Sequence, residues 1–573
     1  MVLALLLAAA APLTTESERS GFVTTGRYAE VEQLCAEFPR RYPGLVRCEK
    51  FGQTPQGRPM LALVASADGT FEPKANQAKK RPVLLAEGGI HAGEIDGKDA
   101  GFWVLRELLD GAKAKDAILA KVTFVFVPVF NIDGHERFGP NNRPNQVGPK
   151  EMGFRVNARN LNLNRDWLKA EAPETQAMVG LLTRYDPILF ADLHVTDGAK
   201  FQPDVAVNLE PQQGFAQPLK PVGQQIVAKL FEGLKAQGHQ PLPFYPSFDK
   251  EDEPLSGFTY GIPPPRFGNG FWALHHRFGV LVETHSWKDY AARVKVTHDV
   301  LLGLLDLARR DGATWLAAAA EADAKPEGGP LELRYGSTGE TETIDFPGYA
   351  FTRERSEVSG KFWVRYDDAK PQVWKVPYAK TVKPTVTAAP PQAGWVVPAE
   401  YAAVVRPKLE VHGVTFRELT KAVENAPVEV FRVTQAKFKG APYEGRQTVA
   451  LEGAYEKSTR TLAKGSLFVP AAQRLPTLAA HLLEPLGPDS LAQWGFFNAH
   501  LEEKEYLEDY LAEDYARTLL KDPAVKQAFE EKIAKDADFA KSPERRLHFF
   551  YERHPAYDPR FNVLPVVRVD VAP

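Results

Sequence analysis

An imidazole and a carboxylate stand three residues apart just after a short apolar run. His91 and Glu94 follow residues 83–86 and a pair of glycines, which permit a tight turn. The apolar run has the length of one buried strand, and residues 97–109 continue with helical periodicity. Open α/β sheets bind ligands where a strand ends and feeds a helix, so this pair can share a cation, usually zinc. The alternative is a surface turn in which Glu94 caps the helix.

Three further apolar runs have the same form, and they cover residues 121–130, 188–195 and 278–283. Each is rich in β-branched or aromatic residues, which is typical of a buried strand, and each ends in polar side chains. His194 and Glu283 lie at two of these ends. A hydrolytic zinc needs three protein ligands and one open position, and His91, Glu94 and His194 would supply the three ligands.

The remaining polar residues fit a hydrolase. Such a site needs a second carboxylate that takes the proton of the attacking water and passes it to the leaving amine, and Glu283 suits that role. Asn164 and Arg165 stand between the second and third runs. A guanidinium group matches the geometry of a carboxylate, so this pair could hold an anionic end of a substrate. As alternatives, Glu283 could be an ion-pair partner and the pair could be ordinary turn residues.

The ordered set of these motifs resembles the zinc metallocarboxypeptidase family related to carboxypeptidase A. The motifs are HAGE, NIDG, NLNLNRDW, DLHVTDG and VLVETHSW, and the resemblance covers roughly residues 25–310. It implies a mixed, twisted eight-stranded sheet with helices on both faces and one Zn²⁺ per chain. The ligands would be His91, Glu94 and His194. The substrate would be a peptide whose free C-terminal carboxylate is bound by Asn164 and Arg165.

Two further roles in the family fall on positions outside the matched motifs. The arginine that stabilises the oxyanion should lie between the second and third motifs, where Arg143, Arg155 and Arg159 are available. We favour Arg143, although ungapped counting lands near Gln146. The substrate-binding tyrosine is assigned by spacing to Tyr260, 23 residues before the general base. Residues 244–271 are expected to form one wall of the pocket for the C-terminal side chain.

Composition limits the class of protein. The chain has 573 residues and a formal net charge of −3, which argues against nucleic-acid binding. Residues 2–12 are apolar, too short to span a bilayer and followed by polar residues, as in a secretory signal peptide. We therefore expect an exported protein, without stable membrane insertion after signal removal. Cys35 and Cys48 could form a small-loop disulfide or remain two buried thiols. The sequence does not indicate an oligomeric state.

The alternation of strand and helix patterns, together with a Pro-rich stretch, predicts five segments in the chain. They are a signal peptide at 1–20, a catalytic α/β domain at 21–325, a small β-sandwich at 326–379, a linker at 380–398 and a mixed α/β accessory region at 399–573.

Three functions are compatible with these residues. The first is a zinc metallocarboxypeptidase with Glu283 as general base. The second is a zinc amidohydrolase that uses the same site on cell-wall peptides or N-acyl amino acids. The third is a non-enzymatic binding protein, which the long C-terminal region motivates but the complete ligand set disfavours.

Overall fold

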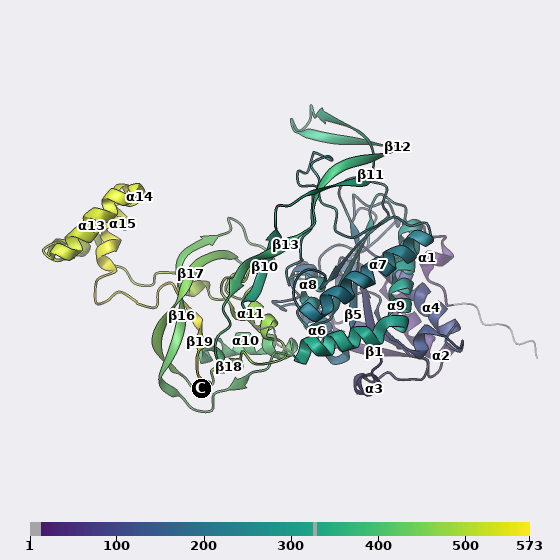
Figure 1. The fold of residues 1–573 in the computed structure, drawn as a ribbon, viewed down its shortest axis with the longest axis horizontal. Helices are drawn as coiled ribbons and strands as arrows, with labels where there is room; N and C mark the ends of the chain where they lie inside the picture. The colour runs from purple at the N-terminus through teal and green to yellow at the C-terminus, as the bar shows by residue number, and fades with distance from the viewer. Residues whose placement is uncertain (1–12, 325–328) are drawn as a thin grey trace, which may run out of the picture.

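The computed structural model describes residues 13–324 and 329–573. Figure 1 shows a helix-covered sheet, a β-ribbon that projects from it, a second β-rich region and a separate group of C-terminal helices. Residues 1–12, which form most of the expected signal peptide, lie outside the described residues. Within that predicted segment, α1 (Glu16–Arg19) packs on the domain, where Glu18 pairs with Arg106.

The N-terminal α/β domain is built on one eight-stranded sheet with the order β1-β2-β4-β3-β5-β9-β6-β7. The strands are β1 (Val46–Gln53), β2 (Pro59–Ala65), β3 (Val83–Gly88), β4 (Thr123–Val127), β5 (Leu189–Thr196), β6 (Val205–Glu210), β7 (Pro241–Leu242) and β9 (Phe278–His285). The four strands expected from apolar runs are the adjacent central strands β4, β3, β5 and β9. They run parallel, so their carboxyl ends share one edge of the sheet. The predicted fold class is confirmed.

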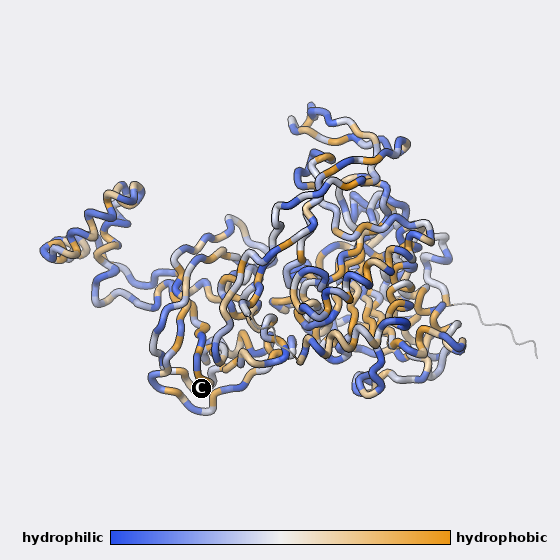
Figure 2. The backbone as a smooth tube through the Cα atoms, viewed as in Figure 1, coloured by the Kyte–Doolittle hydropathy of each residue, from blue (hydrophilic) through white to orange (hydrophobic). Residues whose placement is uncertain are grey.

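Helices cover both faces of this sheet. One layer contains α2 (Tyr28–Arg41), α4 (Asp96–Asp110), α7 (Lys220–Ala236) and α9 (Tyr290–Ala324). The other contains α6 (Pro173–Tyr185), beside β1, and α8 (Gly268–Ala273), beside β5 and β9. Shorter elements are α3 (Pro73–Ala78), η1 (Ile118–Ala120), α5 (Ile132–Glu136), η2 (Leu163–Arg165), η3 (Gln217–Leu219) and β8 (Phe258–Thr259). Figure 2 shows hydrophobic stretches concentrated within this layered part. Burial of both faces explains why the central strands are continuously apolar.

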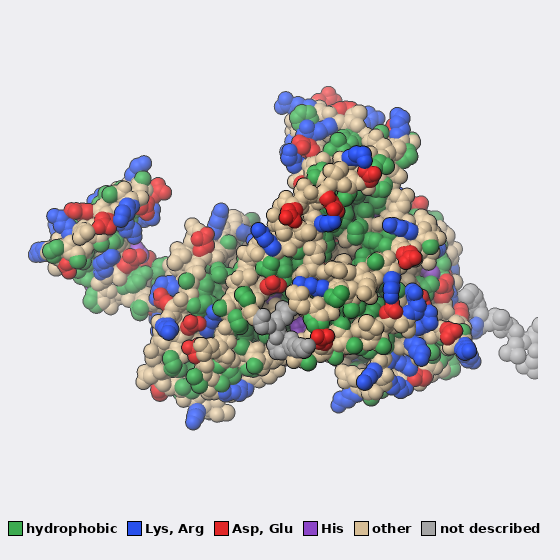
Figure 3. All heavy atoms as spheres, in the orientation of Figure 1, with side chains coloured by type: hydrophobic (Ala, Val, Ile, Leu, Met, Phe, Trp, Pro, Cys, Tyr) green, Lys and Arg blue, Asp and Glu red, His purple; other side chains and the backbone are tan. Residues whose placement is uncertain are grey.

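Cys35 and Cys48 form a disulfide that joins α2 to β1, which decides between the two alternatives left by the sequence. Among the described residues, no helix combines the length and apolar character needed to cross a bilayer. On the face drawn in Figure 3, Lys and Arg side chains are interspersed with Asp and Glu.

The region after the α/β domain differs from the predicted sandwich and linker. A long hairpin of β11 (Glu342–Arg355) and β12 (Phe362–Ala379) pairs with β8, and β10 (Leu331–Ser337) pairs with β13 (Val382–Ala388). The predicted linker therefore contains β13 and also β14 (Gly394–Val397). Pro384 is accommodated because β13 is paired on one side only. The strand pattern was correct, but these strands form a projecting ribbon instead of two packed sheets (Figure 1).

The accessory region forms a six-stranded sheet with the order β15-β18-β14-β19-β16-β17. Its further strands are β15 (Arg417–Glu418), β16 (Val423–Phe438), β17 (Val449–Leu462), β18 (Leu467–Pro470) and β19 (Val563–Val569). Its helices are α10 (Ala399–Val411), α11 (Pro476–Leu483), η4 (Asn498–Leu501), α12 (Asp509–Leu519), α13 (Pro523–Lys535), α14 (Ala537–Lys541) and α15 (Pro543–Tyr551). Buried residues of α10 and β16 belong to the same hydrophobic core as the eight-stranded sheet. The two regions therefore pack as one unit.

His239 links two elements of the α/β domain, and we expect it to make the stability of the domain depend on pH. The imidazole lies 2.7 Å from Asp204 and 2.9 Å from Asp299, and hydrogen bonds to these carboxylates raise its pKa from 6.5 to about 9. The stabilisation is complete below pH 6.5 and is lost as the pH rises through 9. We expect His239→Gln to lower the free energy of unfolding by roughly 2 kcal/mol at pH 6. Denaturant unfolding should show little difference at pH 10, and an equal loss at both pH values would contradict this interpretation.

Candidate metal centre

The loop between β3 and α4 positions His91 and Glu94. Gly89 has a φ of 68°, which allows the chain to turn sharply away from β3. A Cβ atom on Gly93 would lie 2.6 Å from both the Cγ of Arg143 and the carbonyl oxygen of Gly153, so this loop requires glycine for close packing. His194 comes from the end of β5. The loop and the strand end thus meet at the shared sheet edge that the sequence predicts.

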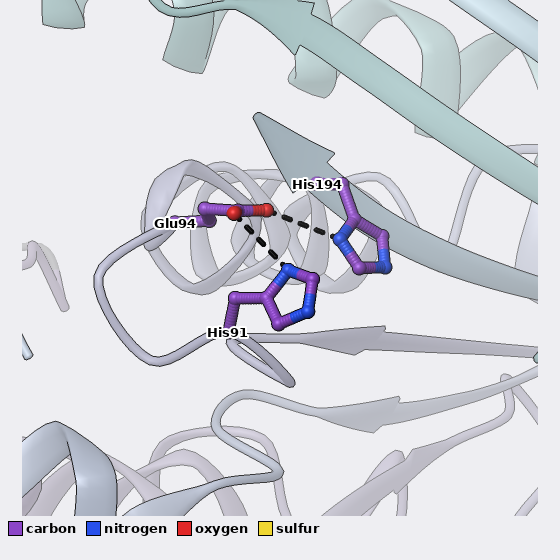
Figure 4. A group of neighbouring side chains, drawn as sticks. All are labelled: His91, Glu94 and His194. Atoms are coloured by element: carbon purple, nitrogen blue, oxygen red, sulfur yellow. Dashed lines mark hydrogen bonds and ion pairs between the residues drawn. The ribbon is translucent and has the colours of Figure 1, made fainter. Parts of the chain in front are cut away.

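Glu94 contacts both imidazoles, one through each carboxylate oxygen (Figure 4). His91 Nδ1 is 3.1 Å from Glu94 Oε1, and His194 Nδ1 is 3.1 Å from Glu94 Oε2. One ligand atom from each of the three residues lies within 4.8 Å of the others, and all three residues are buried. The three side chains predicted to hold the metal therefore converge on one point.

The far nitrogen of each imidazole lies close to a side-chain oxygen. His91 Nε2 forms a 3.1 Å hydrogen bond with Asn162 Oδ1, whereas His194 Nε2 is 2.7 Å from Asp192 Oδ1 without the geometry of a hydrogen bond. The bond to Asn162 fixes the ring orientation of His91 and leaves its Nδ1 free to coordinate a metal. Sequence reasoning missed Asn162 and Asp192, although each stands two residues before a residue that it did assign.

The protonation states of the imidazoles also bear on metal binding. Burial lowers the pKa of His91 to about 4, so this ring is neutral at neutral pH, as a ligand must be. Burial also lowers the pKa of His194, but Asp192 and Glu94 outweigh it and raise the value well above normal. A cation bound here would displace the proton of His194. Two imidazoles and one carboxylate form a set that zinc uses in hydrolytic sites, so the residues present fit that ion.

Glu283 lies beside this cluster. Glu283 is on β9, where it pairs in register with His194 of the neighbouring parallel strand β5, and it is 9% exposed. Its Oε2 atom has no hydrogen-bond partner among the described residues. Burial, followed by the carboxylates of Glu94 and Asp192, raises the pKa of Glu283 to about 8. This is the environment of a carboxyl group that can exchange a proton near neutral pH.

Two of the three candidate arginines reach the cluster. Arg143 Nη2 lies 2.9 Å from Glu94 Oε1, and Arg155 Nη1 lies 3.4 Å from the same oxygen. Arg143 is nearly buried, whereas the side chain of Arg155 is 37% exposed. No ion pair of Arg159 with a described residue is observed. Gln146, the position reached by counting, donates to the carbonyl oxygen of Gly93 at 3.1 Å.

Arg165 projects from the 3₁₀ turn η2, which includes Asn164. Its guanidinium group lies over the ring of Phe267, 4.5 Å from the ring centroid. Its Nε donates to the hydroxyl of Tyr443 at 3.0 Å, and its Nη1 donates to the carbonyl oxygen of Asn164 at 2.6 Å. Among the described residues no carboxylate pairs with Arg165, so its charge is free to bind an anion.

Tyr260 does not lie at the metal cluster. Its buried hydroxyl donates to Glu210, which pairs with Gly279 on β9. That position is four residues, or about 13 Å, along the strand from Glu283. The error came from spacing alone, because loop lengths before β9 are not visible in the sequence. Tyr245 lies nearer the cluster: Thr196 Oγ1 donates to its hydroxyl at 2.8 Å. Although the residue is 43% exposed, burial of the hydroxyl and the charge of Glu283 raise its pKa to about 12.

Comparisons with known proteins agree with this geometry. Residues 31–204 match the family model of zinc carboxypeptidases, a range that includes the three candidate ligands but ends before Glu283. The chain is 33% identical over 126 residues to the inactive metallocarboxypeptidase ECM14 of Saccharomyces cerevisiae, covering 20% of this chain and 28% of the relative. It is 33% identical over 132 residues to carboxypeptidase A4 of Mus musculus, covering 22% of this chain and 30% of the relative.

A longer match extends into the accessory region. Carboxypeptidase 2 of Trichophyton rubrum is 24% identical over 466 residues, which are 76% of this chain and 77% of the relative. The other two relatives are therefore matched over less than a third of their own length, whereas this one is matched over most of it. Because one of these relatives is named as inactive, similarity to the family does not by itself establish activity. The activity of this chain has to be judged from its own residues.

Proposed function

Because its N-terminal part belongs to the zinc carboxypeptidase family, we propose that this chain is a zinc-dependent carboxypeptidase that removes C-terminal residues from peptides. The observation that carries the proposal is the convergence of His91, Glu94 and His194, with Glu283 on the neighbouring strand. Asn162, which contacts His91 Nε2, also accepts from the N–H of Asn164, and the next residue, Arg165, is a cation without an ion-paired carboxylate among the described residues. The combination matches hydrolysis of a substrate that ends in a carboxylate.

In the proposed mechanism, one protein group, Glu283, carries the proton from the attacking water to the leaving nitrogen. When bound, zinc would supply Lewis-acid chemistry, which polarises the scissile carbonyl and acidifies water. Glu283 accepts the proton of the attacking water as the oxygen bonds to the carbonyl carbon. It then donates that proton to the leaving nitrogen as the carbon–nitrogen bond breaks. Its buried, unpaired Oε2 suits both steps, since its pKa lies near neutral pH.

In this scheme two arginines stabilise two different negative charges of the substrate. Arg165 binds the C-terminal carboxylate of the peptide. Its planar guanidinium group still has N–H donors that match the planar carboxylate. Arg143 lies beside Glu94 and stabilises the negative charge that develops on the carbonyl oxygen. Tyr245 replaces Tyr260 in the proposal as the tyrosine of the site, because its hydroxyl lies beside β5 at Thr196.

Removing Arg143 tests the oxyanion role. We expect Arg143→Ala to lower kcat/KM by about 10²- to 10³-fold, because one donor to the oxyanion is lost in a buried site. Steady-state kinetics on a C-terminal peptide substrate measure this effect, with Arg159→Ala as a matched loop variant that should stay near the wild-type value. A larger loss in Arg155→Ala than in Arg143→Ala would assign the role to Arg155.

The function itself is tested with zinc-loaded full-length protein and a panel of peptides. We expect release of the C-terminal residue from peptides with a free carboxylate, and little from the same peptides carrying a C-terminal amide. Arg165→Ala should remove most of this difference, because the carboxylate then has no guanidinium partner. Hydrolysis of muropeptides or N-acyl amino acids without cleavage of ordinary peptides would contradict the proposal.

We also propose that the protein is exported. The Cys35–Cys48 disulfide supports this, since structural disulfides persist in oxidising compartments. Fractionation of cells that express the chain with its own N-terminus should place the protein outside the cytoplasm. Recovery of the full-length chain from the cytoplasm alone would contradict export.

A further inference from the structure

A loop of the accessory region reaches the carboxylate-binding turn of the catalytic domain. Residues 439–448 join β16 to β17, and we call them the hairpin loop. Its tip is a two-residue turn in which Tyr443 and Arg446 exchange backbone hydrogen bonds of 2.8 and 3.0 Å. Glu444 and Gly445 occupy the central positions, with φ values of 49° and 73°. Such a turn favours asparagine or glycine at both positions, so glutamate at the first of them lowers the stability of the turn.

The tip contacts the catalytic domain through three side chains. The hydroxyl of Tyr443 accepts from Arg165 Nε at 3.0 Å, and Glu444 Oε2 accepts from the backbone N–H of Asn162 at 2.8 Å. Arg446 forms an ion pair with Glu171. These contacts join residues about 280 positions apart in the chain.

Tyr443 determines which edge of the Arg165 guanidinium group is available. A guanidinium group has five N–H donors. Tyr443 takes the Nε donor, the carbonyl oxygen of Asn164 takes one Nη1 donor, and the ring of Phe267 covers one face. The donors that remain are on the terminal nitrogens, and they can bind a carboxylate end-on with two parallel hydrogen bonds.

Glu444 holds the turn that carries Arg165. Asn162 precedes the 3₁₀ turn η2, and its side chain accepts from the N–H of Asn164 at 3.0 Å. The same Asn162 oxygen lies 3.1 Å from His91 Nε2. By binding the backbone of Asn162, Glu444 fixes the residue that connects the carboxylate-binding turn to a candidate metal ligand.

The rest of the accessory region keeps the hairpin loop in place. Lys408 donates to the carbonyl oxygen of Lys169, and His412 Nε2 lies 2.7 Å from the carbonyl oxygen of Leu168. The ring of Tyr443 stacks on Trp494, with centroids 5.8 Å apart. The accessory region therefore contacts several residues of the segment that follows Arg165. The stacking on Trp494 also fixes the position of the Tyr443 ring.

We propose that the accessory region completes the substrate-carboxylate site, with Tyr443 and Glu444 as positioning residues for Arg165 and its turn. The inference rests on the proposed function, because it assigns Arg165 to the C-terminal carboxylate. It gives the accessory region a defined role in recognition of the substrate. It also explains why a glutamate is kept at a turn position that disfavours it.

The first experiment measures carboxylate binding directly. Calorimetry with zinc-loaded full-length protein uses N-acetyl derivatives of Phe, Leu, Lys and Glu, each compared with its carboxamide. Tyr443→Phe should raise Kd for the preferred acid about tenfold, since a hydrogen bond that orients a charged group is lost, and leave carboxamide binding unchanged. In an Arg165→Ala background the same change should have no further effect. The control is Tyr510→Phe, because Tyr510 is 69% exposed on α12.

The second experiment separates positioning from folding. Asparagine adopts a positive φ more readily than glutamate but is too short to make the contact of Glu444. Glu444→Asn should therefore keep or raise the melting temperature while raising KM about fivefold and leaving kcat and zinc content unchanged. Glu452→Asn, at an exposed position on β17, is the control.

The outcomes distinguish the two proposals. Wild-type protein that binds no acid more tightly than its carboxamide would overturn the proposed function and this inference with it. Wild-type discrimination that persists in both Tyr443→Phe and Glu444→Asn would overturn the inference alone. Equal loss of acid and carboxamide binding, with a lower melting temperature, would also overturn it, because it would indicate a structural role only.

Discussion

Replacing Glu283 with glutamine is expected to lower kcat by about a thousandfold while zinc content and KM stay close to the wild-type values. The amide has the same shape but cannot accept the proton of the attacking water. The carboxyl group is buried, lies in register with His194 and has an Oε2 atom without a partner among the described residues. Nothing in this packing requires its charge for folding, so the loss should appear in the chemical step.

The measurement is steady-state kinetics together with metal analysis of the same preparations. Glu210→Gln is a matched control, because Glu210 is also buried in the sheet but bonds to Tyr260 away from the metal cluster. Burial raises the pKa of Glu210 to about 7, so an uncharged replacement is tolerable there. Full activity of Glu283→Gln would exclude Glu283 as the general base. Loss of zinc in that variant would instead show that Glu283 is a ligand.

The central part of the fold could be predicted because its signals are local. Buried parallel strands are continuously apolar, and helices alternate with them, so β3, β4, β5 and β9 are recognisable as separate runs. Parallel strands bring their carboxyl ends to one edge, so polar residues there can be grouped without knowing the loops. This is why His91, Glu94 and His194 could be assigned together from the sequence.

Long-range contacts account for what the sequence did not reveal. Tyr260 was chosen by counting back from Glu283, but the loops before β9 place Tyr245 beside Thr196 and Tyr260 on Glu210. Asn162 looks like a turn residue until His91 is seen beside it. The contact of Tyr443 with Arg165 depends on how two regions pack, and no local pattern encodes that packing.

The choice among arginines and the boundaries of the C-terminal segments have a similar origin. Arg143, Arg155 and Arg159 all lie in a loop-rich stretch without a periodic pattern, so the sequence does not show that Arg143 and Arg155 contact Glu94 and Arg159 does not. The Pro-rich residues 380–398 have the composition of a linker, yet Pro384 lies in an edge strand that needs hydrogen bonds on one side only. The composition of a segment indicates its intrinsic preference for a linker or a strand. Whether the segment forms a strand also depends on which other strand lies beside it in the fold.

Removing one imidazole from the candidate centre should abolish metal binding. We expect wild-type protein to hold about one zinc ion per chain and His91→Ala or His194→Ala to retain little after dialysis, because two protein ligands do not form a stable hydrolytic site. Activity should fall with the metal. Added zinc should raise the melting temperature of the wild type but not of either variant, since only a folded site binds the ion.

The control for this prediction is His298→Gln. His298 is also buried, but it bonds to Asp299 and Glu107, so its loss should leave zinc stoichiometry unchanged. Metal analysis and thermal unfolding with and without zinc measure the effect independently of any substrate. Undiminished zinc binding by His91→Ala would mean that the ion is held elsewhere. The buried Glu94 would then serve only its ion pairs with Arg143 and Arg155, and the proposed activity would lose its basis.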